Sequence, residues 1–212
     1  MSFFFGLFHF SPLRVKDEPQ ERKKLPMKPS EQVEKQPFIF LDRDGTLIEE
    51  VYYGHKLEDY ALIPGAIESL QRFRDAGYRM AIVTNQSGLG RGIFGMEDYE
   101  IFHGRLLSDL DEAGIDIVET YMCPHAPDET CVCRKPLPTS LFHARDHHQA
   151  DLNASWMIGD HVKDVETAAN AGTHGILLLT GHGADEATRL GDVPHDAVLA
   201  DITAAANHIL AT

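Results

Sequence analysis

Two carboxylates, Asp42 and Asp44, stand two positions apart directly after the apolar run Phe38–Leu41. In an extended chain, residues i and i+2 project to the same side, so both acids can address one point in space. The apolar run is typical of a fully buried parallel strand, and Gly45 permits the turn that follows it. The pattern predicts a catalytic or metal site at the carboxyl end of a strand, where open α/β sheets bind their ligands.

Three more polar clusters follow strand-like runs further along the chain. They are Thr84-Asn85, Arg134-Lys135, and Asp160 together with Asp164. Since the carboxyl ends of parallel strands lie along one edge of a sheet, these clusters can converge with Asp42 and Asp44. Carboxylates beside a hydroxyl and a lysine suit a hard cation such as Mg²⁺ together with a phosphate group. A single acidic pair is commonly a cap or a turn, whereas the order of all four clusters favours one active site.

The four clusters resemble the motifs of the haloacid dehalogenase (HAD) superfamily of phosphatases, over nearly all of residues 37–212. The matching positions are LDRDGT at Leu41–Thr46, Thr84 after Ala81-Ile82-Val83, Lys135, and Gly159-Asp160 followed by Asp164. The resemblance implies a HAD-like α/β fold with a parallel sheet. It also implies an enzyme that hydrolyses phosphate monoesters with the help of Mg²⁺.

By the same resemblance, each motif residue has an expected role. Asp42 would be the nucleophile that forms an aspartyl-phosphate intermediate. Asp44 would be the general acid toward the leaving alcohol and then the general base toward water. Mg²⁺ would be held by Asp42, Asp160 and the main-chain carbonyl of Asp44, while Thr84 and Lys135 would bind the phosphoryl oxygens. The charges of the metal and the lysine would offset the repulsion between a carboxylate and an anionic phosphate.

A second constellation contains all three cysteines of the chain, in the order Cys123-x-His125-x₅-Cys131-x-Cys133. Three thiolates and one imidazole at this spacing predict a closed tetrahedral Zn²⁺ site, which is structural rather than catalytic. The odd, tightly clustered cysteines do not fit a disulfide framework and indicate a reducing compartment. The alternative, unligated cysteines in a loop, would expose reactive thiols without a packing benefit. Because Lys135 follows the last ligand closely, zinc would fix the loop that delivers this lysine.

A zinc loop narrows the resemblance to a subgroup that contains phosphatases of heptose 1,7-bisphosphates and phosphatases of histidinol phosphate. The runs Tyr53–Asp59, Ile63–Ala66 and Thr84–Phe94 are similar to the heptose enzymes. Histidinol-phosphate enzymes tend to have an acidic residue after the Asn-Gln pair and no equivalent of Arg91. The resemblance therefore favours removal of the C7 phosphate of a heptose bisphosphate in lipopolysaccharide-precursor synthesis, with histidinol phosphate as the alternative substrate. A non-catalytic phosphoryl-binding module is a third reading, although a pure binder would not need both acids of the first motif.

A bisphosphate substrate needs a second anion site, for which Arg134 and Arg91 are candidates because a guanidinium can bind phosphate through two hydrogen bonds. Polar residues of the segment after the first strand could bind sugar hydroxyls, namely Glu50, Tyr52, Tyr53 and His55. Further candidate substrate contacts follow the second strand and the zinc loop: Thr84, Asn85, Gln86, Ser87 and Lys135. Each of these residues could instead be an ordinary exposed loop residue.

Apolar periodicity and capping residues predict an α/β domain whose parallel sheet is covered by helices on both faces. We expect strands at 38–41, 78–83, 115–122, 155–158 and 174–179, and helices from Pro64 to Gly77 and over 96–113, 138–149, 162–171 and 201–210. Residues 47–62 show no clear period and should form a short flap near the site, with no large cap domain. His143, His147 and His148 fall on one predicted helix, where we expect a solvated face rather than a metal site.

The composition divides the chain into residues 1–36 and the phosphatase-like domain 37–212. The first part is apolar and then rich in Lys, Glu, Pro and Gln, which predicts a disordered or loosely attached extension or a weak partner-docking anchor. The net charge of −14 argues against nucleic acid or an anionic membrane as a partner. No apolar run approaches the roughly 18 residues of a membrane span, and the start lacks secretory features. We expect a cytoplasmic monomer that acts on a small phosphorylated sugar.

Overall fold

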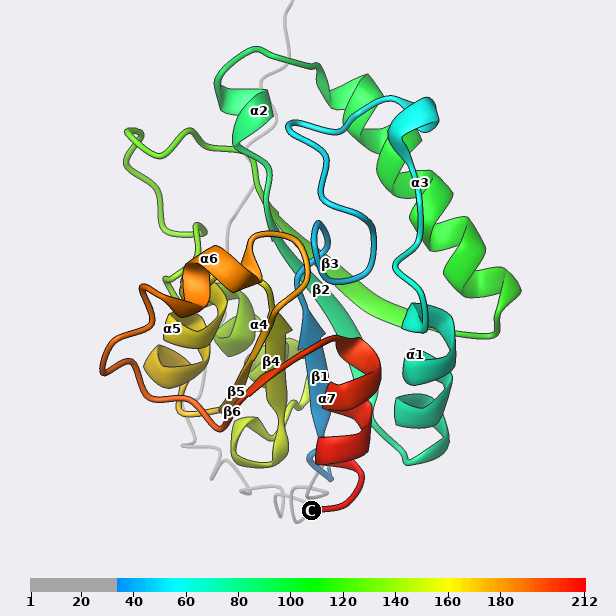
Figure 1. Cartoon of the computed structure of the whole chain (residues 1–212), viewed down its shortest axis with the longest axis vertical. Helices are drawn as coiled ribbons and strands as arrows, with labels where there is room; N and C mark the ends of the chain where they lie inside the picture. The colour runs from blue at the N-terminus through cyan, green and yellow to red at the C-terminus, as the bar shows by residue number, and fades with distance from the viewer. Residues whose placement is uncertain (1–33) are drawn as a thin grey trace, which may run out of the picture. The chain divides into compact units, whose positions relative to one another are not determined.

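The computed structural model describes residues 34–212, which form one α/β unit (Figure 1). Most of the predicted extension 1–36 lies outside the described residues. Gln36 already belongs to the folded unit, because its backbone pairs with the segment around Ala150. Within the described part of the chain, no helix is long and apolar enough to cross a lipid bilayer.

A six-stranded sheet in the order β3-β2-β1-β4-β5-β6 forms the centre of the unit, and every pair of neighbouring strands is parallel. The strands are β1 (Phe38–Leu41), β2 (Arg79–Asn85), β3 (Ile117–Cys123), β4 (Trp156–Gly159), β5 (His174–Leu178) and β6 (Ala197–Leu199). The five predicted strands are confirmed with shifts of one or two residues at their ends. The sixth strand, β6, was not predicted because three residues are too few to show a period.

Helices cover both faces of the sheet, as the sequence predicts (Figure 1). They are α1 (Ala66–Asp75), α2 (Ser87–Gly90), α3 (Met96–Glu112), α4 (Thr139–His148), α5 (Val162–Ala171), α6 (Gly183–Ala187) and α7 (Ile202–Ile209), with short 3₁₀ turns at Leu57–Asp59 and Leu152–Ala154. The two shortest helices, α2 and α6, were not predicted. Both lie within turns beyond strand ends and contain too few residues for an apolar stripe.

The alternation of side chains along β1 divides the core between the two faces. Ile39 and Leu41 pack with residues of α1, α3 and α7, while Phe38 and Phe40 pack with residues of α4 and α5. All four side chains are fully buried, which explains why the strand reads as an unbroken apolar run. Because both faces of β1 are covered, its carboxyl end is the place where the strand can present polar groups to a ligand.

Candidate active site

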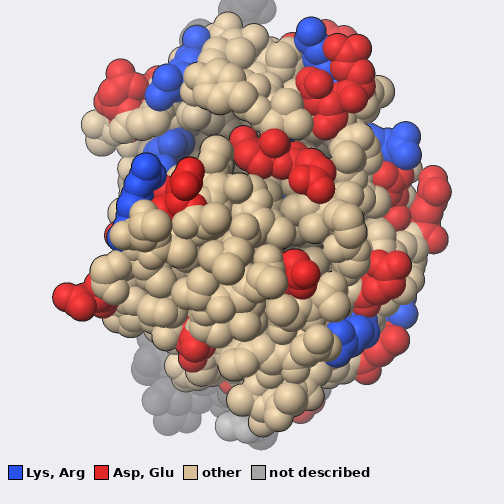
Figure 2. Space-filling model, viewed as in Figure 1, with Lys and Arg blue, Asp and Glu red and all other residues tan. Residues whose placement is uncertain are grey.

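A cavity of about 320 Å³ lies at the carboxyl ends of β1, β2 and β4. It is lined by the segment after β1, the end of β2, the loop between β3 and α4, and the start of α5. Figure 2 shows acidic side chains in the hollowed part of this face and a strip of Lys and Arg side chains beside it. The sheet order β3-β2-β1-β4 makes the four polar clusters neighbours, so the structure brings together the residues that the sequence predicted to converge.

Asp42 is buried at the end of β1 with one carboxylate oxygen already engaged. Its Oδ1 atom accepts a hydrogen bond from the backbone N–H of Arg43 at 2.7 Å and lies 2.9 Å from the Nζ atom of Lys135. The described residues give Oδ2 no hydrogen bond. The two oxygens are therefore inequivalent, and Oδ2 is the one available to a ligand in the cavity.

Lys135 is buried and lies between two carboxylates. Its Nζ atom is 2.9 Å from Asp42 Oδ1 and 2.6 Å from Asp164 Oδ1, and it also donates to the carbonyl of Val83 at 2.7 Å. The other oxygen of Asp164 accepts a hydrogen bond from the backbone N–H of His161 at 3.0 Å at the start of α5. Asp164 thus serves as the partner that fixes the lysine, a role that spacing alone did not reveal.

Crowding of carboxylates changes the protonation equilibria of the site. Burial raises the pKa of Asp42 to about 6, with Lys135 opposing the shift and Asp164 adding to it. Burial, followed by the charges of Asp42 and Asp164, raises the pKa of Asp160 to about 8. The two nearby carboxylates also raise the pKa of Lys135, because they outweigh its burial. A cation placed among these acids would therefore be strongly favoured at neutral pH.

The residues around Asp160 fit a small cation. One oxygen from each of Asp42, Asp160 and Asp164 lies within 4.8 Å of the others, and carboxylate oxygens are the ligands that Mg²⁺ prefers. Asp160 Oδ2 accepts a hydrogen bond from the backbone N–H of His182 at 2.8 Å. Gly45, at a φ of 73°, packs against this carboxylate so closely that a Cβ atom there would collide with it. The expected Mg²⁺ ligands Asp42 and Asp160 therefore meet at one point of the cavity.

Asp44 is held by two groups that sequence reasoning did not assign to it. The Nε and Nη2 atoms of Arg43 donate to its two oxygens at 3.0 and 2.8 Å, and Gln86 Nε2 donates to Oδ2 at 2.8 Å. Arg43 is itself buried, with its guanidinium over the rings of Tyr99 and Phe102. This pair fixes the carboxylate of the expected acid/base. An arginine between two acids carries no signal of this role in a single sequence.

The polar residues at the end of β2 form hydrogen bonds with other residues of the site. Thr84 Oγ1 accepts a hydrogen bond from Gln86 Nε2 at 2.9 Å. The side-chain amide of Asn85 pairs with the backbone of Lys135 in both directions, donating to its carbonyl at 3.2 Å and accepting from its N–H at 3.1 Å. Ser87 lines the cavity at the first position of α2. Asn85 therefore fixes the loop of the lysine, although it was predicted as a substrate contact.

The segment after β1 forms one wall of the cavity. Glu50, Tyr52 and Tyr53 line it, whereas His55 does not and instead stacks on Phe94 with ring centroids 5.1 Å apart. Burial, followed by the charges of the two acids of the first motif, raises the pKa of Glu50 to about 7. Three of the four residues predicted to contact sugar hydroxyls are therefore in place to do so.

Positively charged side chains other than Lys135 also line the cavity. Arg134 lines the cavity, and its Nη1 atom donates to the carbonyl of His125 at 3.0 Å. Lys163, from the first turn of α5, lines it as well and was missed in the sequence because one lysine in a helix carries no signal. Arg91 is exposed at the end of α2 and does not line the cavity. Of the two arginines predicted to bind a second anion, only Arg134 therefore lines the cavity, and Lys163 lines it as well.

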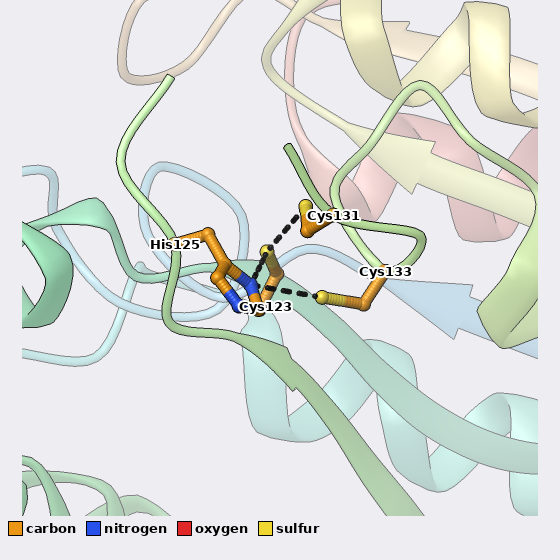
Figure 3. A group of neighbouring side chains, drawn as sticks. All are labelled: Cys123, His125, Cys131 and Cys133. Atoms are coloured by element: carbon orange, nitrogen blue, oxygen red, sulfur yellow. Dashed lines mark hydrogen bonds between the residues drawn. The ribbon is translucent and has the colours of Figure 1, made fainter. Parts of the chain in front are cut away.

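The four residues of the cysteine constellation converge on one point (Figure 3). Cys123 Sγ lies 3.5 Å from His125 Nδ1 and 3.8 Å from Cys131 Sγ, and Cys133 Sγ lies 3.3 Å from His125 Nδ1. Ligands at zinc bond lengths and tetrahedral angles would be about 3.6–3.8 Å apart. The side chains thus fit a tetrahedral metal ion. Cys123 ends β3, and the other three residues lie on the loop that continues to Lys135.

On α4, His143 and His147 are exposed, as expected of a solvated face, while His148 is partly buried. Glu119 of β3 lies against the helix, and one ligand atom each of Glu119, His143 and His148 falls within 4.8 Å of the others. The sequence could not reveal this group because its acid comes from a different element of secondary structure.

Comparison with known proteins gives a consistent result. Residues 132–205 match the family described as "HAD-hyrolase-like". The chain is 38% identical over 157 residues to a Photorhabdus laumondii protein named D-glycero-alpha-D-manno-heptose-1,7-bisphosphate 7-phosphatase, covering 70% of this chain and 86% of that protein. It is 37% identical over 154 residues to an Escherichia coli K12 protein named as the 7-phosphatase of the beta anomer, covering 68% and 80%.

A solved structure agrees with these relatives. The D,D-heptose 1,7-bisphosphate phosphatase from B. bronchiseptica, complexed with magnesium and phosphate, superposes with a TM-score of 0.76 at 31% identity. The match covers 82% of this chain and 98% of that one.

Proposed function

This chain belongs to the HAD phosphatases, in the group of the heptose-bisphosphate 7-phosphatases, and we propose that it removes the C7 phosphate of D-glycero-D-manno-heptose 1,7-bisphosphate. The proposal places the reaction in the supply of heptose for lipopolysaccharide precursors. Relatives at 36–40% identity that carry this enzyme name support it. A phosphomonoesterase acting on a sugar bisphosphate agrees with a cavity that has both acidic and basic walls.

The observation that carries the proposal is the position of Lys135 between Asp42 and Asp164. It leaves Oδ2 of Asp42 free of hydrogen bonds among the described residues while Oδ1 is fixed. A carboxylate held in this way is oriented for attack before the substrate arrives, which removes much of the entropic barrier. The lysine also supplies positive charge next to the phosphoryl group.

In the proposed reaction, Asp42 Oδ2 attacks the phosphorus atom of the C7 phosphate. The bond between this phosphorus and the oxygen on C7 of the sugar breaks. Asp44 donates a proton to that leaving oxygen, and an aspartyl phosphate remains on Asp42. Asp44 then accepts a proton from water as the water oxygen attacks the phosphorus. Inorganic phosphate leaves, Asp42 is a carboxylate again, and Asp44 again holds the proton with which the cycle began. Arg43 and Gln86 orient the Asp44 carboxylate through their three hydrogen bonds.

Two metal ions complete the proposal. Asp42, Asp160 and the main-chain carbonyl of Asp44 would hold Mg²⁺, which supplies charge stabilisation for the phosphoryl group and offsets the crowded carboxylates. The four side chains of the cysteine constellation would hold a structural Zn²⁺. Their sulfur and nitrogen atoms leave no open ligand position for catalysis. We expect the zinc to order the loop that continues to Lys135.

The C1 phosphate of the substrate needs a second anion site. We assign it to Arg134 and Lys163, which line the same cavity as Lys135. Glu50, Tyr52 and Tyr53, which also line this cavity, would bind sugar hydroxyls. A bisphosphate is favoured over histidinol phosphate because the latter would place its own cationic amine near these two cations. We further propose that the enzyme works as a monomer in the cytoplasm, where its three free cysteines would remain reduced.

A comparison of kcat/KM for both anomers of the heptose bisphosphate and for histidinol phosphate tests the substrate assignment. We expect a preference of at least about 100-fold for a bisphosphate, because a site built for a charged group rejects substrates that lack it. Lys163→Met should raise KM for the bisphosphate by about 10-fold or more, while Arg91→Met should leave it unchanged. A preference for histidinol phosphate would overturn the substrate assignment.

Asp42→Asn tests the mechanism separately from the substrate. The substitution keeps the shape of the side chain but removes the nucleophile, so turnover should fall by at least about 10⁴-fold. In a rapid-quench experiment, acid should trap a phosphorylated protein in the wild type before phosphate is released. Asp42→Asn should not form this species. Wild-type turnover by this variant would refute the covalent mechanism. It would also refute any other mechanism in which the Asp42 carboxylate takes part.

A further inference from the structure

Three side chains with metal-binding atoms meet at the outer edge of the sheet, away from the cavity. Strand β3 is the edge strand, and helix α4 packs over one of its faces. His148 Nε2, at the last position of α4, lies 2.9 Å from Glu119 Oε2 on β3. His143 brings a second imidazole nitrogen, so that one ligand atom from each of the three residues falls within 4.8 Å of the others.

The fold directs these side chains toward one another. Glu119 and Tyr121 oppose Ala81 and Val83 of β2, which belong to the core beneath α4, so they share the sheet face that the helix covers. On α4, Leu141 and Ala144 fill that core. The histidines on the side of the helix are thereby placed over the edge strand.

A simple ion pair between His148 and Glu119 does not explain the whole group. His143 takes no part in that pair, and its Nδ1 atom has only a long contact of 3.4 Å to the hydroxyl of Tyr121. The ring of His147 stacks on His143 with centroids 4.1 Å apart, which restricts the orientation of the His143 ring. A second imidazole is thus held near the pair without forming a strong bond of its own.

We propose that Glu119, His143 and His148 bind a divalent transition-metal ion of the zinc type. Two imidazoles and one carboxylate suit such ions, whereas Mg²⁺ prefers oxygen ligands alone. Three protein ligands leave at least one coordination position for water. His143 is exposed and the other two side chains are partly buried, whereas the cysteine constellation includes the buried Cys123, so this ion would exchange more readily than one held by the cysteines.

Such an ion would link the edge strand to the end of α4. Helix α4 directly follows the loop that contains Lys135, so the link would stabilise the helix to which that loop is attached. An ion that binds only the folded state raises the free energy of unfolding in proportion to its affinity and concentration. This inference does not rest on the proposed phosphatase reaction.

Titration with Co²⁺ tests the site in protein that carries zinc on its cysteine constellation and is saturated with Mg²⁺. Calorimetry should detect one further ion in the wild type. The visible spectrum should contain d–d bands without a thiolate-to-metal charge-transfer band, which distinguishes this ion from cobalt that has replaced zinc at the cysteines. Unfolding temperature should rise with Co²⁺ concentration.

His143→Ala and His148→Ala should each bind this ion at least about 10-fold more weakly. Loss of a group that only hydrogen-bonds to a metal ligand already lowers metal affinity by about this factor, and loss of a ligand itself should lower it further. His195→Ala, an exposed histidine elsewhere on the surface, is the matched control and should bind as the wild type does. Glu119→Gln preserves the shape of the acid and should also lose the ion. Absence of a further ion in the wild type, or equal binding by wild type and His143→Ala, would overturn the proposal.

Discussion

The carboxylate cluster in the cavity and the cysteine constellation beside it both contain side chains that suit a metal ion, but different parts of the chain position them. Asp42 follows β1 and Asp160 follows β4, two strands that pair directly. In the cysteine constellation, Cys123 ends β3 and the other three ligands lie on a loop. The sheet therefore positions the first set, whereas the second set depends on loop conformation.

The carboxylate cluster and the cysteine constellation also differ in which groups offset their negative charge. The carboxylates contact Lys135 and accept backbone hydrogen bonds, so the fold itself offsets part of their charge. The cysteine side chains contact mainly one another, and burial together with a hydrogen bond to Cys133 raises the pKa of Cys123 to about 12. A thiol of this kind needs a metal ion to become a thiolate at neutral pH. The comparison teaches that the sheet arranges the carboxylate cluster, whereas the cysteine loop would depend on a bound ion for its order.

Lys135 connects the two regions. It follows the cysteine constellation in sequence, yet its backbone is held by Asn85 at the end of β2 and its side chain by Asp42 and Asp164. Residues at the ends of β1 and β2 and in the first turn of α5 thus fix the lysine together. Loss of zinc should loosen this arrangement rather than abolish it.

The largest effect on stability should come from Lys135→Met. This substitution tests whether the lysine offsets the negative charge of the carboxylates in the absence of a metal ion. Removal of one partner from a buried ion cluster leaves uncompensated charge, and we expect the free energy of unfolding to fall by about 3–5 kcal/mol. Denaturant titration in magnesium-free buffer measures it. Phosphatase activity should be lost as well.

Lys163→Met is the control for this prediction, since Lys163 lines the same cavity but is partly exposed and has no ion pair in the described structure. It should change stability by no more than about 0.5 kcal/mol. Equal stability losses in the two variants would mean that the buried lysine is not the group that offsets the acids.

A smaller effect is expected from removal of zinc by a chelator or from Cys133→Ser. The loop should lose its order, and the unfolding temperature should fall by at least about 5 °C because binding of a structural zinc contributes directly to folding. Activity should fall by about 10-fold but not vanish, since Asn85 still holds the backbone of Lys135. Differential scanning calorimetry and a steady-state assay measure the two quantities.

Val132→Ser changes the exposed residue between two of the cysteines and should leave both quantities unchanged. Full activity and an unchanged unfolding temperature in zinc-free protein would show that the loop does not depend on its ion. That outcome would remove the main contrast between the two clusters.

The smallest effect should be the pH dependence of stability in magnesium-free protein. The folded-state pKa of Asp160 is raised to about 8 and that of Glu50 to about 7, so the folded state binds more protons than the unfolded state at neutral pH. Stability should therefore fall as the pH rises from about 6.5 to 8. His103 opposes this trend only weakly and less with rising pH. Burial lowers its folded-state pKa to about 4, and the unfolded imidazole, with its ordinary pKa of about 6.5, loses its proton across the lower part of this range.

Unfolding temperatures measured at both ends of this pH range should differ by a few degrees, and added Mg²⁺ should remove most of the difference. Asp160→Asn should flatten the dependence without metal. An increase in stability with pH in the magnesium-free wild type would contradict the raised pKa values.

Sequence patterns predicted the parallel sheet, five of its strands and the helices on both faces, because burial imposes a period on every element of sufficient length. They missed β6, α2 and α6, which are too short for a period to show. The cavity residues Asp42, Asp44, Thr84 and Lys135 were identifiable because each follows an apolar run or a known motif. Arg43 and Lys163 were not identifiable as functional residues, since their importance depends on which side chains they face.

The sequence by itself determined which chemical groups this protein has at its strand ends and in its cysteine loop, because residue type and local spacing are properties of the chain. Only the tertiary structure decided their partners. It placed Lys135 between Asp42 and Asp164, brought Gln86 to Asp44, and brought Glu119 of β3 beside the histidines of α4. These contacts join residues whose relative positions depend on strand order and helix packing, and no local pattern encodes that order.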